Sequence, residues 1–97
     1  MIKRDGERML VGGPLTLASV AAALREGSAA IEQGARSVDL SEVGEVDSSA
    51  LALLLAWLRE AKRLKRGISF ANLPQGLTTI AHLYGVAELL SASPAHH

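Results

Sequence analysis

An uninterrupted apolar run of nine residues, Ala50 to Leu58, constrains this chain more than any other feature of its sequence. A helix that crosses a membrane needs about 20 such residues, so this run is too short to span one. The three residues before it, Asp47-Ser48-Ser49, are typical caps of a helix N-terminus, and Gly67 is typical of a helix end. We therefore expect the longest helix of the fold to begin at this turn and to run to about Arg66.

This helix has more apolar surface than one core requires. Its expected core stripe is Leu51, Leu54, Leu55, Leu58 and Ala61. An adjoining flank is also apolar and holds Ala50, Leu53, Trp57 and Leu64. A helix that is apolar all round is normally buried on every side, which a chain of 97 residues can hardly achieve. We expect this flank to bind a partner through Leu53 and Trp57, because Trp is enriched at interface hot spots. The alternative is that Trp57 lies beneath a neighbouring part of its own fold.

Strand and helix patterns alternate along the rest of the chain. Alternating apolar residues and turn residues predict strands at 2–4, 7–11, 37–40 and 68–71. Gly12-Gly13-Pro14 is expected to end the second strand. Thr16 is the expected N-cap of a helix that Gly34 ends, and a last helix is expected at about 77–84. The apolar stripe expected on the helix after Thr16 is Leu17, Val20, Ala21, Leu24 and Ile31.

This order, β-β-α-β-α-β-α, predicts one α/β domain with a mixed sheet of four to five strands and helices packed on it. We expect the domain to occupy residues 1–90. Residues 91–97 form a polar tail that we expect to fray, and His96-His97 is either a tag remnant or natural.

Composition excludes several classes of protein. The chain has no cysteine, which excludes disulfide scaffolds and thiolate zinc sites, and His82 stands alone without neighbouring ligands. Its ten basic and ten acidic residues give a net charge of zero, which argues against binding nucleic acid. Asp5 and Glu7 are misplaced for the basic start of a secretion signal, so we expect a cytoplasmic protein.

The zero net charge hides two opposed clusters. The segment 39–47 carries four acidic residues, and the segment 59–66 carries five basic residues and one acidic residue. The simplest interpretation of the basic cluster is a solvated helix end, since cations are favourable near a helix C-terminus.

The Asp47-Ser48-Ser49 turn is the candidate site. Free N–H groups at a helix N-terminus favour an anion such as a phosphate, and three capping residues in a row are a hint of more than capping. No His or Lys lies near enough in the sequence to activate either serine, so we expect no catalysis and no cofactor. Phosphorylation of a serine here would meet repulsion from Asp47.

The residues around this turn resemble a known family signature. Val38-Asp39-Leu40-Ser41 and, after a loop, Val46 to Leu54 are similar to the signature of the STAS domain, which is found in bacterial anti-anti-sigma factors and in the tails of sulfate transporters. The order of elements and the Asn72-Leu73 turn also fit, so the resemblance covers nearly the whole chain. Within the family, the aliphatic run 51–55 and the pair Leu83-Tyr84 are similar to the small cytoplasmic subunits of Mla-type phospholipid transporters.

The resemblance implies a non-enzymatic adaptor that binds the ATPase subunit of an ABC transporter, and with it the inner membrane. The alternative that it leaves open is an anti-anti-sigma factor that a serine kinase phosphorylates. Carried over by position, Ser48 takes the place of the hydroxyl residue implicated in the ATPase contact, and Ser49 that of the phosphorylated serine. Ala50 replaces the usual glycine, which could alter how closely a partner approaches.

Overall fold

The computed structural model describes residues 1–91 of the chain. Its elements in chain order are β1 (Ile2–Asp5), β2 (Arg8–Leu15), α1 (Val20–Glu32), β3 (Ser37–Val46), α2 (Ser48–Arg63), β4 (Ser69–Ala71), α3 (Gln75–Leu83) and α4 (Ala87–Ser91). The prediction of an α/β fold with this alternation is confirmed. The short helix α4 was not predicted.

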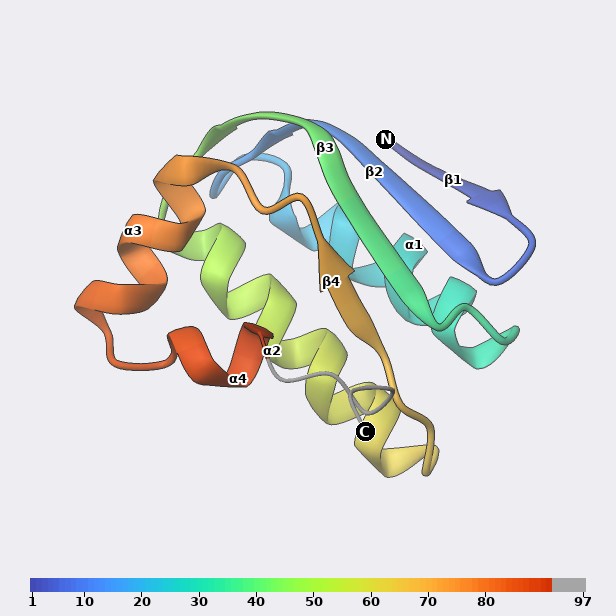
Figure 1. Ribbon diagram of the computed structural model, residues 1–97. Coiled ribbons are helices and arrows are strands. Elements are labelled where there is room, and N and C mark those ends of the chain that lie inside the picture. The colour runs from blue at the N-terminus through green and yellow to red at the C-terminus, as the bar shows by residue number, and fades with distance from the viewer. Residues whose placement is uncertain (92–97) are drawn as a thin grey trace.

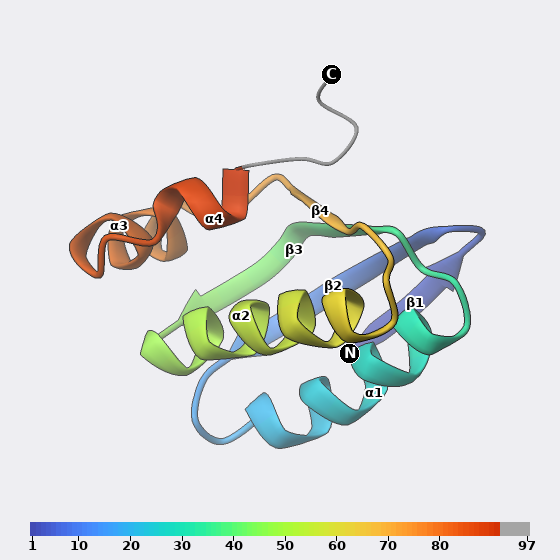
Figure 2. The same cartoon turned by 90° about the horizontal axis from the view of Figure 1, so that it is seen from below.

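The four strands form one mixed sheet in the order β1-β2-β3-β4 (Figure 1). β1 is antiparallel to β2, whereas β2 is parallel to β3 and β3 is parallel to β4. Both β-α-β units advance in the same direction across the sheet, so α1 and α2 lie on the same face (Figure 2). α3 and α4 lie beside α2, on the side away from α1. α2 therefore has neighbours on three sides.

β2 is longer than predicted, because Gly12-Gly13-Pro14 does not end it. The register with β3 shifts between Leu10 and Gly12 and again between Gly13 and Leu15. Gly13 has a φ of +82°, which glycine adopts without steric cost. β1 pairs with β2 only as far as Val11, so Pro14 lies beyond the end of β1, where a missing N–H is tolerated.

α1 begins later than predicted and buries a different stripe. Its N-cap is Ser19, because the carbonyl of Thr16 accepts the N–H groups of Ser19 and Val20 and forms a turn before the helix. The buried residues of α1 are Ala23, Gly27, Ala30 and Ile31. Of the stripe predicted from the sequence, only Ile31 is buried, since the small residues face α2 and bring the two helices close together.

The apolar flank of α2 is buried, and the prediction that it is exposed to a partner is wrong. Ala50 and Leu53 are core residues, and Trp57 has no exposed surface. The indole of Trp57 lies against Gly27 of α1, where even a Cβ atom would be 2.2 Å from its Cζ2 atom. The flank is buried because α1 and α3 pack on α2 at once, which accommodates a helix that is apolar all round.

No helix within residues 1–91 is long and apolar enough to cross a membrane. The predicted frayed tail falls almost wholly on residues 92–97, which lie outside the described part of the chain, as do His96 and His97. Ser91 itself is the last residue of α4.

Candidate partner-binding site

Asp47 fixes the turn that precedes α2. One of its carboxylate oxygens, Oδ1, accepts the N–H of Ser49 at 2.8 Å, as the predicted N-cap should. The other, Oδ2, accepts the N–H of Leu17 at 3.1 Å and ties the turn to the loop between β2 and α1. The backbone N–H of Asp47 also donates to the carbonyl of Leu15. The carboxylate of Asp47 therefore holds two distant segments together.

These bonds keep the carboxylate ionised. The N–H of Leu17 lowers the pKa of Asp47 most, and partial burial acts in the opposite direction. The N–H and hydroxyl of Ser49 lower this pKa further, so that the net shift is downward. The negative charge also lies at the N-terminus of α2, where the helix dipole favours it.

Ser48 is the exposed residue of the turn. Its side chain makes no hydrogen bond with any other residue in the range 1–91, so its hydroxyl is available to a partner. Ser49 is half-buried, and its N–H is occupied by Asp47. The N–H of Ala50 is occupied by the carbonyl of Asp47. Few N–H groups of this helix end are therefore free for an anion such as the phosphate considered from the sequence.

Ala50 does not obstruct the turn. Its methyl group is wholly buried in the core, so it does not project towards a partner approaching Ser48. The departure from the usual glycine thus leaves the outer surface of the turn open.

α3 supports the turn from the other side. A Cβ atom at Gly76, in the first turn of α3, would lie 3.0 Å from a methyl group of Val46, so α3 packs closely against the residue before Asp47. Together with the Leu17 bond, this contact fixes the two residues that precede Ser48. The result is a rigid, exposed serine at the end of a buried helix.

Sequence reasoning missed the exposed apolar residues around this part of the fold. Leu17, whose N–H binds Asp47, has 77% of its surface exposed. Tyr84, which follows the last residue of α3, is 63% exposed, and the neighbouring Leu83 is exposed as well. The sequence signals this exposure only through position: Leu17 lies in the turn before α1, and Tyr84 directly precedes Gly85. By contrast, Leu53 and Trp57 are buried and do not belong to this surface.

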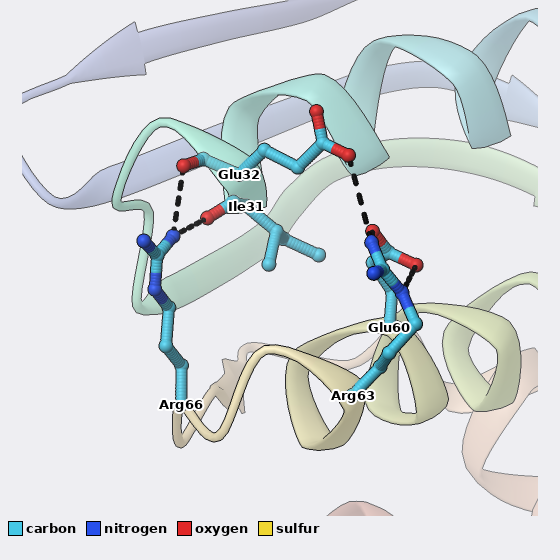
Figure 3. Close-up of polar contacts among 5 residues, drawn as sticks. All are labelled: Ile31, Glu32, Glu60, Arg63 and Arg66. Atoms are coloured by element: carbon cyan, nitrogen blue, oxygen red, sulfur yellow. Dashed lines mark hydrogen bonds and ion pairs between the residues drawn. The ribbon is translucent and has the colours of Figure 1, made fainter.

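The basic end of α2 is a second, separate feature. Arg63 makes ion pairs with Glu60 at 2.6 Å and with Glu32 of α1 at 3.7 Å (Figure 3). Arg66 donates to the backbone carbonyls of Ile31 and Glu32, at the C-terminus of α1. These two arginines bind α1 to α2, so part of the basic cluster is structural and is more than a solvated helix end.

Nothing in the range 1–91 groups three or more His, Asp or Glu side chains as a metal site would require. The site has a fixed carboxylate, a free hydroxyl and nearby exposed apolar side chains. Such an arrangement is suited to protein contact, since it combines a polar group with apolar area.

A family model described as "Mlab, STAS domain" matches residues 2–91. The chain belongs to the STAS domain family. STAS domains are protein-interaction modules, which agrees with the chemistry of the turn. No curated protein sequence matches the chain significantly.

Solved structures of STAS proteins share the fold. The anti-sigma factor antagonist SpoIIAA in its unphosphorylated form is 19% identical over 98% of this chain and 89% of its own, with a TM-score of 0.70. A protein described as an anti-sigma factor antagonist of Thermotoga maritima is 11% identical over 94% of this chain and 82% of its own, with a TM-score of 0.74. At these identities the likeness extends to the fold alone.

Proposed function

We propose that this STAS domain is the small adaptor subunit of an Mla-type ABC transporter. In this role it binds an MlaF-like ATPase subunit in the cytoplasm, associates with the inner membrane only through that partner, and supports assembly and activity of the complex. The process served is phospholipid transport that maintains the lipid asymmetry of the outer membrane. The chain itself contributes contacts and no catalysis.

One observation carries the proposal: the exposed hydroxyl of Ser48 directly follows two fixed residues, Asp47, which accepts the N–H of Leu17, and Val46, which packs against α3. A pre-organised surface loses little conformational entropy on binding, which favours a permanent subunit contact. The description of the matching family model, which names Mlab, supports the choice of partner.

The test is co-expression with a tagged ATPase subunit of the transporter, followed by affinity purification. Ser48→Arg places a long charged side chain on the exposed turn, and we expect it to abolish co-purification. Because Ser48 is exposed and its hydroxyl makes no bond in the described chain, the variant should fold normally by circular dichroism.

Ala29→Arg is the matched control, since it adds the same side chain at an exposed position near the far end of α1. It should co-purify like the unmodified chain. A correctly folded Ser48→Arg protein that still binds the ATPase would count decisively against the proposed site.

A second candidate function is that of an anti-sigma factor antagonist controlled by phosphorylation of Ser49. It is supported by the fold shared with two proteins of that description. The half-buried position of Ser49 beside the carboxylate of Asp47 means that a phosphate there would be repelled and would disrupt the turn. Such a modification would therefore release a partner.

Incubation with the cognate serine kinase and ATP, read by intact mass, tests this candidate. Gain of one phosphate that Ser49→Ala abolishes would support the regulator over the adaptor. An unchanged mass under conditions where the kinase is active would exclude it.

A further inference from the structure

A groove lies along the C-terminal half of α2, away from the Ser48 turn. It has a volume of about 860 Å³, within the range of about 300–1,000 Å³ that is usual for small-molecule sites. Its walls come from one face of α2 between Leu55 and Lys62, from residues 65–68 between α2 and β4, and from Leu89 of α4. Leu89 is 55% exposed, which leaves apolar surface uncovered at the groove within the described chain.

Three cations beside this groove have no partner among residues 1–91. Of the basic residues of the segment 59–66, Arg63 is bound by two glutamates and Arg66 by the carbonyls at the end of α1 (Figure 3). The side chains of Arg59, Lys62 and Lys65 line the groove and make no hydrogen bond or ion pair with the rest of residues 1–91. They are exposed and free to meet an anion.

The polarity of the groove changes along the axis of α2. Leu55 and Leu58 come first in the chain, and every cation of the groove follows them. The apolar Ala61 and Ile68 also line the basic end, but both are buried and expose almost no surface there. At 1.5 Å per residue, the segment from Leu55 to Arg63, the last residue of α2, spans roughly 12 Å. An amphipathic helix divides its polarity around its axis, whereas this groove divides polarity along its length. A molecule with an apolar tail and an anionic head matches that division.

We propose that this groove binds a single-chain anionic amphiphile of the fatty-acid class. The alkyl chain lies over Leu55, Leu58 and Leu89, and the carboxylate lies among the ammonium groups of Lys62 and Lys65 and the guanidinium of Arg59. Burial of each methylene of such a chain is favourable by the hydrophobic effect, and the carboxylate supplies the charge that the three cations lack. This binding is independent of the ATPase contact, because it uses the opposite end of α2.

Isothermal titration of the whole 97-residue chain with dodecanoate, below its micelle concentration, tests the proposal. We expect one molecule to bind per chain. The double variant Lys62→Glu/Lys65→Glu, at two exposed positions, should weaken binding by about tenfold or more, because it replaces two attractions with two repulsions. Dodecyltrimethylammonium, which has the same chain and a positive head, should bind the unmodified protein more weakly than dodecanoate.

Lys3→Glu/Arg25→Glu is the matched control, since it makes the same change of net charge at exposed positions of β1 and α1. This double variant should bind dodecanoate as the unmodified chain does. Ser48→Arg should also bind dodecanoate normally, even if it no longer binds the ATPase subunit. Absence of dodecanoate binding would overturn the proposal. Equal binding by the Lys62/Lys65 variant, or binding only to intact anionic vesicles, would overturn it as well.

Discussion

The indole ring of Trp57 lies directly against the backbone of Gly27, on the helix that precedes it in the sequence. A Cβ atom at Gly27 would come within 2.2 Å of Cζ2 and 2.3 Å of Cε2 of the ring. The ring Nε1–H points to the carbonyl of Leu24, although at 3.5 Å this bond is long. The missing side chain of Gly27 is therefore what allows the largest side chain of the core to lie between α1 and α2.

We expect Gly27→Ala to destabilise the protein by about 1–3 kcal/mol, because the added methyl group forces the helices or the indole apart. Alanine is the better helix former by about 1 kcal/mol, so any loss of stability must come from the clash. The measurement is urea denaturation followed by circular dichroism.

Gly44→Ala is the control, because a Cβ atom at Gly44 would meet nothing within 4 Å and the backbone there is not left-handed. Its stability should change by less than about 0.5 kcal/mol. A Gly27→Ala protein as stable as the unmodified chain would show that the interface between α1 and α2 is looser than the contact with Trp57 implies.

This contact also marks the limit of what the sequence could reveal. The alternation of strands and helices and the Asp47 cap follow from local patterns, and the structure confirms both. The burial of Trp57 depends on a glycine thirty residues earlier, whose local effect is only to weaken a helix. Periodicity therefore found an excess of apolar surface on α2 but could not say what covers it.

The candidate site could be predicted only in part, because local patterns reveal its helix cap but not its long-range contacts. Capping chemistry is local, so Asp47-Ser48-Ser49 was recognised as a helix start. The second bond of Asp47, to Leu17, joins segments thirty residues apart and leaves no pattern. α4 has five residues, too few for a helical period to be visible. Since α4 supplies Leu89, the groove along α2 could not be predicted either.

Lys65, just after the end of α2, gives a second prediction. Its φ is +59°, in the left-handed region that costs a residue with a side chain about 1 kcal/mol or more. Glycine adopts this conformation freely and is the usual residue at such a helix end. Part of the gain is offset, because glycine also raises the conformational entropy of the unfolded chain. We expect Lys65→Gly to stabilise the protein by about 0.5 kcal/mol.

Lys65→Ala is the matched control, since it removes the same ammonium group but keeps the Cβ atom. It should bring no gain in the urea midpoint. Equal stabilisation by both variants would mean that the charge of Lys65, and not its backbone conformation, is the source of the cost.

Asn72 has the same backbone conformation for a different purpose. Its φ is +60°, and its side-chain amide donates to Oδ1 of Asp39 at 3.2 Å. We expect Asn72→Gly to lose only this bond, at about 0.5–1.5 kcal/mol. Asn72→Ala should cost about 1 kcal/mol more, because alanine also bears the left-handed strain. Denaturation of both variants separates the two effects, and a smaller loss for alanine than for glycine would contradict the assignment.

Asp39 makes stability depend on pH. Its carboxylate accepts the N–H of Ser41 and the amide of Asn72, and it faces Arg8 at 3.5 Å. These groups, the Ser41 N–H first, lower the pKa of Asp39 below its ordinary value of 3.8, against the opposing effect of burial. Because the folded-state pKa is lower than the unfolded one, the stabilisation is complete above the unfolded value and is lost as the pH falls through the folded one.

We therefore expect Asp39→Asn to be less stable than the unmodified chain near neutral pH. Below about pH 4, where Asp39 becomes protonated in the unfolded chain, we expect the stability of the unmodified chain to fall more steeply than that of the variant. Urea midpoints measured at falling pH should bring the two curves together. Glu45→Gln removes a carboxylate of the same strand that makes no ion pair in the described chain, and it should retain the acid dependence of the unmodified protein. If the stability of Asp39→Asn instead followed that of the unmodified chain in parallel at every pH, the acid sensitivity would belong to other carboxylates. Asp47, whose carboxylate accepts two backbone N–H groups, would then be the first to replace.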